Sequence, residues 1–332
     1  MPERLAIIGA GAMGMNHART AFGLHSEVEL VAVVDQDLGR ARSLVQEFNM
    51  GSTKPFDNLS DIDGDIADIA IIATPSSLHC LQSTELMRNG VHVLVEKPAA
   101  LKDEELTEMK RVQEEEKKVL MVGHVELFNP VVNELLKVIG ERAIRSMRFK
   151  RLGLVNDQSR LYHDVVRDLM LHDLSIADAV VSSDIPAQVI SAFGRSDTKA
   201  FPDPAEVIID YGNGIDGQFR ASRAFTGGKV RSVEVETEDG VFDADLLTRS
   251  ITQRSGREGA IAPNGTYIQD IRTSSHFANG SRQPLELELL HFISSVREQT
   301  APCEARVSID DARRIMKLTE NILSNLVLLK KS

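Results

Sequence analysis

The chain has 332 residues, enough for two domains of ordinary size, and its 42% hydrophobic and 26% charged residues are typical of a globular protein. A formal net charge of −11 argues against nucleic acid as a partner, and no apolar run approaches the roughly 18 residues of a membrane span. The short apolar run Leu5–Ala10 is followed by no cleavage-type region, so we expect no signal peptide and a cytoplasmic protein.

Strand and helix patterns alternate over the first 122 residues. The expected strands are Leu5–Gly9, Val28–Asp35, Ala67–Thr74, Val91–Val95 and Val119–Val122, and the expected helices are Ala12–Leu24, Leu38–Phe48, Ser77–Asn89 and Asp103–Lys118. Such alternation indicates a doubly wound parallel sheet with helices on both faces, and continuous apolar strands agree because parallel strands are buried on both sides. We therefore expect residues 1–122 to form a Rossmann-type α/β domain.

The pattern changes after residue 123. The expected helices are Asn129–Ile139, Val165–Val181, Pro284–Gln299 and Ile309–Leu329, and the expected strands are Ile144–Leu152, Gln188–Phe193, Glu206–Tyr211, Gly214–Ala221, Lys229–Thr237 and Gly240–Leu246. The pair Asn213-Gly214 predicts a hairpin turn, whereas the polar, Gly- and Ser-rich segment Thr248–Ser281 is expected to be loop. Residues 123–332 are therefore expected to form an α+β domain with a large open, mostly antiparallel sheet.

The segment Gly9-Ala10-Gly11-Ala12-Met13-Gly14 matches G-x-G-x-x-G, and it follows a predicted strand and opens a predicted helix. The glycines permit a tight turn, a close approach to a pyrophosphate and close helix packing, and the helix N-terminus at Ala12 and Met13 favours phosphate. Asp35 lies 21 residues after Gly14, where an acid bonds the adenosine ribose and repels a 2′-phosphate, so we expect NAD. Arg40 lies close enough to keep NADP open.

Three further motifs resemble the Gfo/Idh/MocA oxidoreductase family, which includes glucose–fructose oxidoreductase and inositol dehydrogenase. They are Ala73-Thr74-Pro75 with His79, Glu96-Lys97-Pro98, and Asp168–Asp173 (DLMLHD). The segment Val122–Pro130 (VGHVELFNP), followed by Asp164-Val165-Val166, resembles the nucleotide-sugar branch of that family, whose best-known type is UDP-N-acetylglucosamine 3-dehydrogenase. Leu127 stands where this branch usually has an arginine.

The resemblance implies oxidation of a sugar hydroxyl, in which Lys97 hydrogen-bonds the reacting hydroxyl and Pro98 follows a cis peptide. Asp168 and His172 are spaced i, i+4, which puts both on one face of a helix, where a carboxylate can orient an imidazole. The resemblance makes His172 the general base and Asp168 its partner. Lys97 as the proton acceptor remains open.

The remaining candidate residues have weaker support. The resemblance implies that Glu96 bonds the nicotinamide ribose, that Thr74, Pro75 and His79 line the cofactor path, and that His124 and Asn129 face the cleft. The Arg151 guanidinium suits bidentate contacts with a nucleotide diphosphate, and Tyr162 and His163 are candidates for sugar contacts. Each of them also fits a plain structural role, as a cap, a core polar group or a surface side chain.

The two cysteines, Cys80 and Cys303, lie far apart and outside any metal-ligand spacing, so we expect free thiols and no bound metal. The prediction for function is an NAD-dependent sugar dehydrogenase that oxidises a secondary hydroxyl, the 3-hydroxyl, of a nucleotide-linked sugar such as UDP-N-acetylglucosamine. Three alternatives stay open: an inositol or free-sugar dehydrogenase, an NADP-dependent 3-keto-sugar reductase, and a non-catalytic NAD-binding sensor. We expect residues 123–332 to bind the substrate and to form a homodimer or homotetramer, because an exposed sheet face needs a cover.

Overall fold

The computed structural model describes residues 1–48, 52–154, 164–181, 187–195, 203–256, 260–261, 267–268, 271–278, 280–298 and 306–329. The chain forms two compact units. The first comprises Met1–Phe128 with Arg282–Met316, and the second comprises Asn129–Ser281 with Lys317–Ser332. Among the described residues, no helix is long and apolar enough to span a membrane.

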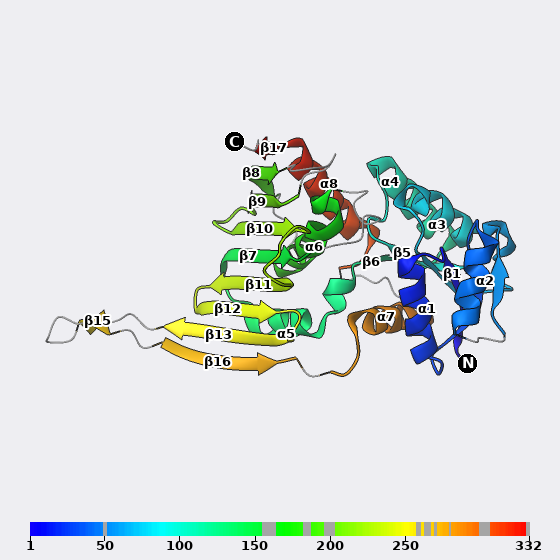
Figure 1. The fold of residues 1–332 in the computed structure, drawn as a ribbon, viewed down its shortest axis with the longest axis horizontal. Helices are drawn as coiled ribbons and strands as arrows, with labels where there is room; N and C mark the ends of the chain where they lie inside the picture. The colour runs from blue at the N-terminus through cyan, green and yellow to red at the C-terminus, as the bar shows by residue number, and fades with distance from the viewer. Residues whose placement is uncertain are drawn as a thin grey trace. The chain divides into compact units, whose positions relative to one another are not determined.

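The first unit contains a six-stranded sheet in the order β3-β2-β1-β4-β5-β6, with every described strand pair parallel. Its strands are β1 (Glu3–Ile8), β2 (Val28–Val34), β3 (Lys54–Phe56), β4 (Ile69–Ile72), β5 (His92–Glu96) and β6 (Leu120–Gly123). Its helices are α1 (Ala12–Gly23), α2 (Leu38–Glu47), α3 (His79–Arg88), α4 (Asp103–Glu116), α7 (Pro284–Glu298) and the first half of α8 (Ile309–Ser324), with short 3₁₀ turns η1 (Leu59–Asp61), η2 (Ser76–Leu78) and η3 (Val125–Phe128). This is the predicted doubly wound Rossmann-type sheet, with helices packed against it (Figure 1).

The first unit takes in a segment that the predicted boundary after residue 122 assigns to the other domain. The side chains of Ile309, Ala312 and Met316 on α8 belong to the same buried cluster as the strands and α4. The N–H of Val122 donates to the Val307 carbonyl at 2.8 Å, which ties this segment to β6. The chain therefore leaves the first unit after Phe128 and returns to it at Arg282, a pairing of distant segments that local patterns do not encode.

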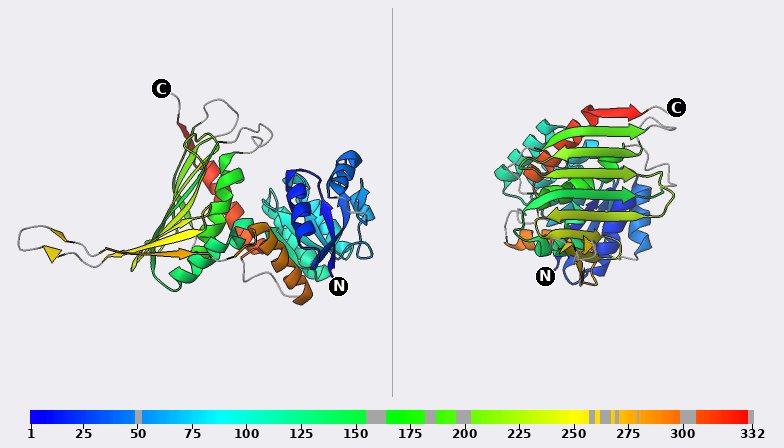
Figure 2. Two further views of the ribbon diagram at one scale, coloured as in Figure 1. Left: turned by 60° about the horizontal axis from the view of Figure 1, so that its bottom comes forward. Right: turned by 90° about the vertical axis from the view of Figure 1, so that its left-hand side faces the viewer.

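The second unit is built on a nine-stranded sheet in the order β16-β13-β12-β11-β7-β10-β9-β8-β17, seen face on in Figure 2 (right). Its strands are β7 (Ile144–Leu152), β8 (Gln188–Arg195), β9 (Ala205–Asp210), β10 (Asp216–Ser222), β11 (Val230–Thr237), β12 (Gly240–Asp245), β13 (Ser250–Gly256), β16 (Ile271–Phe277) and β17 (Leu326–Leu329), and a separate pair joins β14 (Ala260–Ile261) to β15 (Tyr267–Ile268). The helical segments are α5 (Pro130–Ile139), the π-helical turn η5 (Val166–Met170) and α6 (Leu171–Val180). The pairs β7–β10 and β8–β17 are parallel and the other pairs are antiparallel, so the predicted α+β fold with a mostly antiparallel sheet is confirmed.

Local predictions in the second unit are confirmed at one turn and wrong at two segments. Asn213 and Gly214 both have positive φ, +52° and +78°, and they turn the chain between β9 and β10 as predicted. The predicted loop Thr248–Ser281 instead contains β13 and β16, which pair with each other. The side chains of these strands are mostly polar. The sequence therefore lacks the alternation of apolar and polar residues that would have predicted them. The predicted helix Ile309–Leu329 ends at Ser324, and β17 follows it and pairs with β8.

The two faces of the nine-stranded sheet differ. Helices α5 and α6 pack against one face, where alternate side chains such as Met147 and Phe149 of β7 are buried. The intervening positions carry cross-strand ion pairs, Arg148–Glu234 between β7 and β11 and Arg220–Glu206 between β10 and β9, the latter at 3.1 Å. The exposed face is therefore largely charged along its middle strands rather than apolar.

Candidate active site

The glycine loop follows β1 at the carboxyl end of the sheet. Gly9 has φ +103°, and a Cβ there would lie 2.7 Å from the Ala73 carbonyl oxygen, while a Cβ on Gly14 would lie 1.8 Å from the Gly9 carbonyl oxygen. Both positions therefore require glycine for the fold itself. A Cβ on Gly11 would meet nothing within 4 Å, so the absence of a side chain there keeps open space beside the loop.

Among the described residues, no side chain caps the N-terminus of α1. Gly11 is the N-cap residue, and Ala12 and Met13 begin the helix with exposed or half-exposed side chains. The first-turn N–H groups thus face the open space beside Gly11 without a side-chain acceptor. An uncapped helix N-terminus beside an open glycine fits the pyrophosphate of a dinucleotide.

Asp35 lies directly after β2 and is bound to the glycine loop. Its Oδ2 accepts a hydrogen bond from the Ala10 N–H at 2.9 Å, and its Oδ1 accepts one from the Asp37 N–H at 2.9 Å. Asp37 in turn caps α2 by accepting from the Gly39 N–H. The carboxylate is thereby fixed next to the loop, in the position from which the proposed ribose contact would be made.

Glu96, at the end of β5, is buried and hydrogen-bonded to His17, a residue that sequence reasoning missed. The distance from His17 Nε2 to Glu96 Oε1 is 2.8 Å, and the Lys97 N–H donates to Oε2 at 3.2 Å. Burial alone would raise the pKa of Glu96, but the His17 hydrogen bond and the charges of His17 and Lys97 outweigh it and hold that pKa below its ordinary value. The signal for His17 was its place on the buried stripe of α1, with Gly14, Ala18 and Ala21.

Lys97 follows this ionised carboxylate, and the Lys97–Pro98 peptide is cis, as the family resemblance implies. His79 braces the same loop. Its Nδ1 lies 2.9 Å from the Pro98 carbonyl oxygen and its Nε2 lies 2.9 Å from the Thr74 carbonyl oxygen. Burial lowers the pKa of His79, and the neutral ring that results can donate to only one of the two carbonyls at a time.

The predicted cofactor path after β4 is held by local hydrogen bonds. The Thr74 hydroxyl donates to Gln82 Oε1 at 2.6 Å, and Pro75 is the N-cap of the turn η2. His79 itself is 1% exposed, and its ring is buried between the loop that holds Thr74 and the loop that holds Pro98. Thr74 is half-buried and Pro75 is exposed, at the same carboxyl end of the sheet as the glycine loop.

His124 and Asn129 are both buried, at 2% and 6% exposure. His124 follows β6 in the first unit. Asn129 caps α5 in the second unit, where its Oδ1 accepts from the Val131 N–H at 3.2 Å. The capping role anticipated as an alternative for Asn129 is thus present in the structure.

Asp168 lies in the π-helical turn η5, one turn before His172 on α6. Its Oδ2 accepts from Arg223 Nη1 at 3.1 Å, and Arg223 is a second residue that sequence reasoning missed. π-Helical turns are frequent at functional sites. The Asp168 carboxyl remains 29% exposed, whereas the Arg223 side chain is only 2% exposed.

Arg151 does not present a free guanidinium. It is buried on β7, and its Nε and Nη2 lie 2.9 and 2.8 Å from Asp173 Oδ1. A contact with a nucleotide diphosphate would require it to leave that buried ion pair. Tyr162 and His163 lie outside the described residues, as does Cys303.

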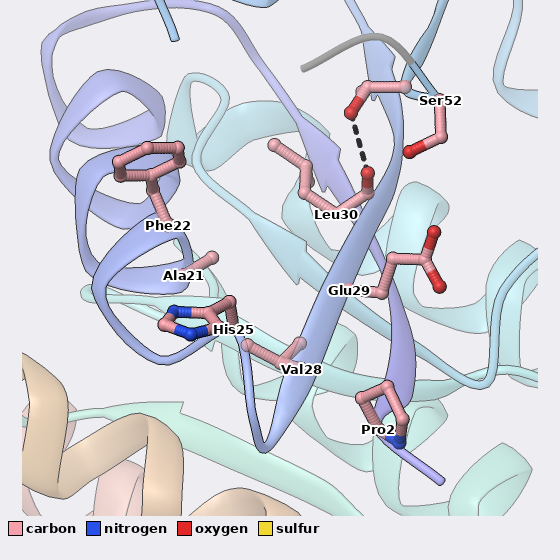
Figure 3. A pocket seen from close by; sticks show the side chains of 9 residues that line it. Pro2, Ala21, Phe22, His25, Val28, Glu29, Leu30 and Ser52 are labelled. Atoms are coloured by element: carbon pink, nitrogen blue, oxygen red, sulfur yellow. Dashed lines mark hydrogen bonds between the residues drawn. The ribbon is translucent and has the colours of Figure 1, made fainter. Parts of the chain in front are cut away.

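A pocket of about 220 Å³ occupies the opposite end of the parallel sheet (Figure 3). The end of α1 (Ala21 and Phe22), the first residues of β2 (Val28–Leu30) and Pro2 line it. Because these are the amino ends of β1 and β2, the pocket lies away from the glycine loop at their carboxyl ends. Within the part of the chain that the structure describes, no group of three or more His, Cys, Asp or Glu side chains is arranged to hold a metal ion.

Comparison with known proteins defines the class of the first unit. Residues 3–124 match the family model described as an oxidoreductase family with an NAD-binding Rossmann fold. The matched range spans β1 to β6 and thus the whole six-stranded sheet. Over this domain the chain matches the Gfo/Idh/MocA oxidoreductases, and it is an enzyme that uses NAD.

Relatives extend the likeness over the whole chain. The scyllo-inositol 2-dehydrogenase (NAD(+)) of Bacillus subtilis is 27% identical over 315 residues, 90% of this chain and 87% of the relative. The UDP-N-acetylglucosamine 3-dehydrogenase of Acidithiobacillus ferrooxidans is 27% identical over 248 residues, 75% of each chain. The solved structure of the latter superposes with a TM-score of 0.84 over 98% of both chains at 22% identity, which establishes the shared fold. A 3-ketoreductase from Actinomadura kijaniata shares that fold at 15% identity, with a TM-score of 0.81 over 100% of both chains.

Proposed function

We propose that this protein is a dehydrogenase that oxidises a secondary hydroxyl, the 3-hydroxyl, of a nucleotide-linked sugar such as UDP-N-acetylglucosamine. The observation that carries the proposal is the motif set, including Val122–Pro130 apart from Leu127, in a chain aligned over three-quarters of its length with a UDP-N-acetylglucosamine 3-dehydrogenase. The first unit is proposed as the NAD-binding domain and the second as the substrate-binding domain. The secondary alcohol loses a hydride and a proton and becomes a ketone.

The glycine loop, Asp35 and the uncapped N-terminus of α1 are the residues proposed to hold NAD. NAD supplies a hydride acceptor at nicotinamide C4. Fixed by hydrogen bonds from Ala10 and Asp37, the Asp35 carboxylate would accept from the ribose hydroxyls and repel a 2′-phosphate. This supports NAD as the cofactor in preference to NADP.

Lys97 and His172 are proposed to handle the hydroxyl proton. We assign His172 as the base that accepts it and Asp168 as the carboxylate that orients the imidazole. Lys97 would donate a hydrogen bond to the hydroxyl oxygen and stabilise the alkoxide as it forms. The ionised Glu96 beneath Lys97 is consistent with a charged ammonium at this position.

The test follows NADH absorbance with NAD⁺ and, in separate reactions, UDP-N-acetylglucosamine, free N-acetylglucosamine and scyllo-inositol. Turnover of the UDP-sugar is expected, and Lys97→Ala and His172→Ala should abolish it while leaving NAD affinity within about twofold of wild type, because neither residue is part of the glycine loop. Lys54→Ala, an exposed lysine on β3, is the matched control and should retain full activity. Full activity in either site variant would refute the assigned roles.

A second candidate, an inositol or free-sugar dehydrogenase, is favoured by the inositol-oxidising relative that aligns over 90% of this chain. Leu127, a buried residue where the nucleotide-sugar branch usually has arginine, also agrees with a substrate that lacks phosphate. NADH formation with scyllo-inositol but not with the UDP-sugar would select this candidate.

We also propose a cytoplasmic homo-oligomer, a dimer or tetramer. Its support is the exposed pair Ile190 and Ile208, at 59% and 41% exposure, on the outward side of β8 and β9. Light scattering tests it: a dimer or tetramer mass is expected, and a monomer at micromolar concentration would refute it.

A further inference from the structure

Arg223 connects three segments of the second unit. It follows β10 directly, and its Nε lies 2.9 Å from Oδ2 of Asp203, which lies two positions before β9. Its backbone N–H also donates to both Asp203 oxygens, at 3.0 and 3.2 Å, and the Ser222 hydroxyl donates to Asp203 Oδ1 at 3.1 Å. Asp203 thus binds both the backbone N–H of Arg223 and the Nε edge of its guanidinium.

The far side of the same guanidinium reaches the turn η5. Nη1 of Arg223 donates to Asp168 Oδ2 at 3.1 Å, and η5 packs against β10. The Asp203 carboxyl is 16% exposed, so the network is buried at its anchor and partly exposed at Asp168. The planar guanidinium of arginine can donate to two carboxylates at once, one from each edge. The ammonium of lysine is a single point charge and cannot replace it in this arrangement.

We propose that Arg223 is a positioning residue for the proposed reaction: it fixes the Asp168 carboxylate beside His172 and limits how strongly that carboxylate holds a proton on the imidazole. The inference rests on the proposed roles of Asp168 and His172. An i, i+4 pair places the two side chains one turn apart, and the guanidinium on Asp168 neutralises part of the charge that would favour an imidazolium. His172 is then freer to release the proton between turnovers.

The other acids of this segment have arginine partners of their own. Asp164 Oδ2 lies 2.9 Å from Arg167 Nη1 within the segment, and Asp173 pairs with Arg151 of β7. These charges therefore face the segment as compensated pairs. The Asp164–Arg167 pair is the matched control, because Arg167 is 40% exposed and lies on the same turn as Asp168 but pairs elsewhere.

The test compares wild type with the double variant Asp203→Asn/Arg223→Gln, which removes both charges of the anchor so that no unpaired charge is buried. We expect kcat to fall about tenfold or more, with KM and NAD affinity nearly unchanged, because the misplaced group acts on the chemical step. The acidic limb of the kcat–pH profile should move to higher pH, since without the charge of Arg223 the Asp168 carboxylate favours the protonated imidazole more strongly. Arg167→Gln should change neither quantity.

Arg223→Lys separates charge from geometry. It keeps the positive charge but cannot span both carboxylates, so the acidic limb should return towards wild type while kcat stays low. If the double variant fails to fold by circular dichroism, a wild-type kcat in Arg223→Lys overturns the proposal by itself. Wild-type kcat and an unmoved limb in a folded double variant overturn it as well.

A readout without turnover keeps this inference separate from the proposed function. The titration midpoint of the His172 ring, followed by NMR in protein without substrate, should rise in the double variant and return close to its wild-type value when Asp168→Asn is added. An unmoved midpoint refutes the inference even if the UDP-sugar is a substrate. A raised midpoint in a protein that oxidises no sugar would support the charge coupling and refute the proposed function alone.

Discussion

Glu288 on α7 offers a quantitative test of how the first unit is held together. Its side chain is fully buried, and neither carboxyl oxygen has a hydrogen-bond partner among the described residues. Burial, and then the negative charge of Glu96, raises the pKa of Glu288 well above 4.5. The folded protein therefore keeps this group protonated at pH values where the unfolded chain has released the proton.

The sign of the effect follows from linkage. A folded pKa above the unfolded value means that the stabilising contribution is complete below pH 4.5 and is lost as pH rises towards the folded pKa. Each pH unit in that window costs about 1.4 kcal/mol. Glu288→Gln removes this cost, so its stability relative to wild type should grow steadily as pH rises from 5 towards the folded pKa of Glu288.

The assay is thermal unfolding of wild type and Glu288→Gln at pH 5, 6 and 7, analysed as the difference between the two proteins so that all other titrations cancel. Glu298→Gln is the control, because Glu298 is an exposed residue at the end of the same helix, and its difference from wild type should not change with pH. A Glu288→Gln difference that stays flat from pH 5 to 7 would show that Glu288 ionises as it does in the unfolded chain, and would refute the reasoning.

Four other substitutions test the cofactor loop and the core of the second unit. Gly11→Ala should leave stability within about 0.5 kcal/mol, since a Cβ there meets nothing within 4 Å, but should weaken NAD binding at least about tenfold by calorimetry. Gly14→Ala should instead destabilise the unit by about 3 kcal/mol, because its Cβ would lie 1.8 Å from a carbonyl oxygen, and equal unfolding of both variants would contradict this contrast. Asp35→Asn should lower NAD affinity about tenfold and raise NADP affinity, and an unchanged NAD/NADP ratio would exclude the ribose contact. Tyr211→Phe should be neutral or slightly stabilising in urea, because burial raises the pKa of Tyr211 and its hydroxyl has no hydrogen-bond partner among the described residues; a loss above about 1 kcal/mol would reveal a hidden partner.

The parts of the fold that sequence reasoning predicted are those with strong local patterns. The apolar strands β1, β2, β4 and β5 read as continuous runs because both of their sides are buried, and Asn213-Gly214 marked its hairpin through positive φ. The return of Arg282–Met316 to the first unit and the pairing of β17 with β8 could not be predicted in this way. Both are contacts between segments distant in sequence, and the polar strands β13 and β16 carry no apolar alternation.

The same limit applies to the site. The glycine loop, Asp35 and Lys97 could be proposed as site residues because each lies at a characteristic distance from a strand end. The partners of these and the other site residues could not be predicted, because each lies far away in sequence: His17 for Glu96, Arg223 for Asp168, and Asp173 for Arg151. A single sequence shows that a residue is charged but not which group neutralises it. Arg151 was therefore predicted to contact a nucleotide diphosphate, whereas in the structure it is buried and paired with Asp173.

The central claim is that the protein transfers a hydride from a nucleotide-linked sugar to NAD⁺. Its most direct test is kcat/KM for NADH formation with UDP-N-acetylglucosamine and with scyllo-inositol side by side, with the oxidised product identified by mass spectrometry and NMR. We expect a clear preference for the UDP-sugar and a 3-keto product that retains the nucleotide. NADH formation with scyllo-inositol alone would contradict the substrate assignment, and no NADH with any sugar alcohol would contradict the proposed reaction.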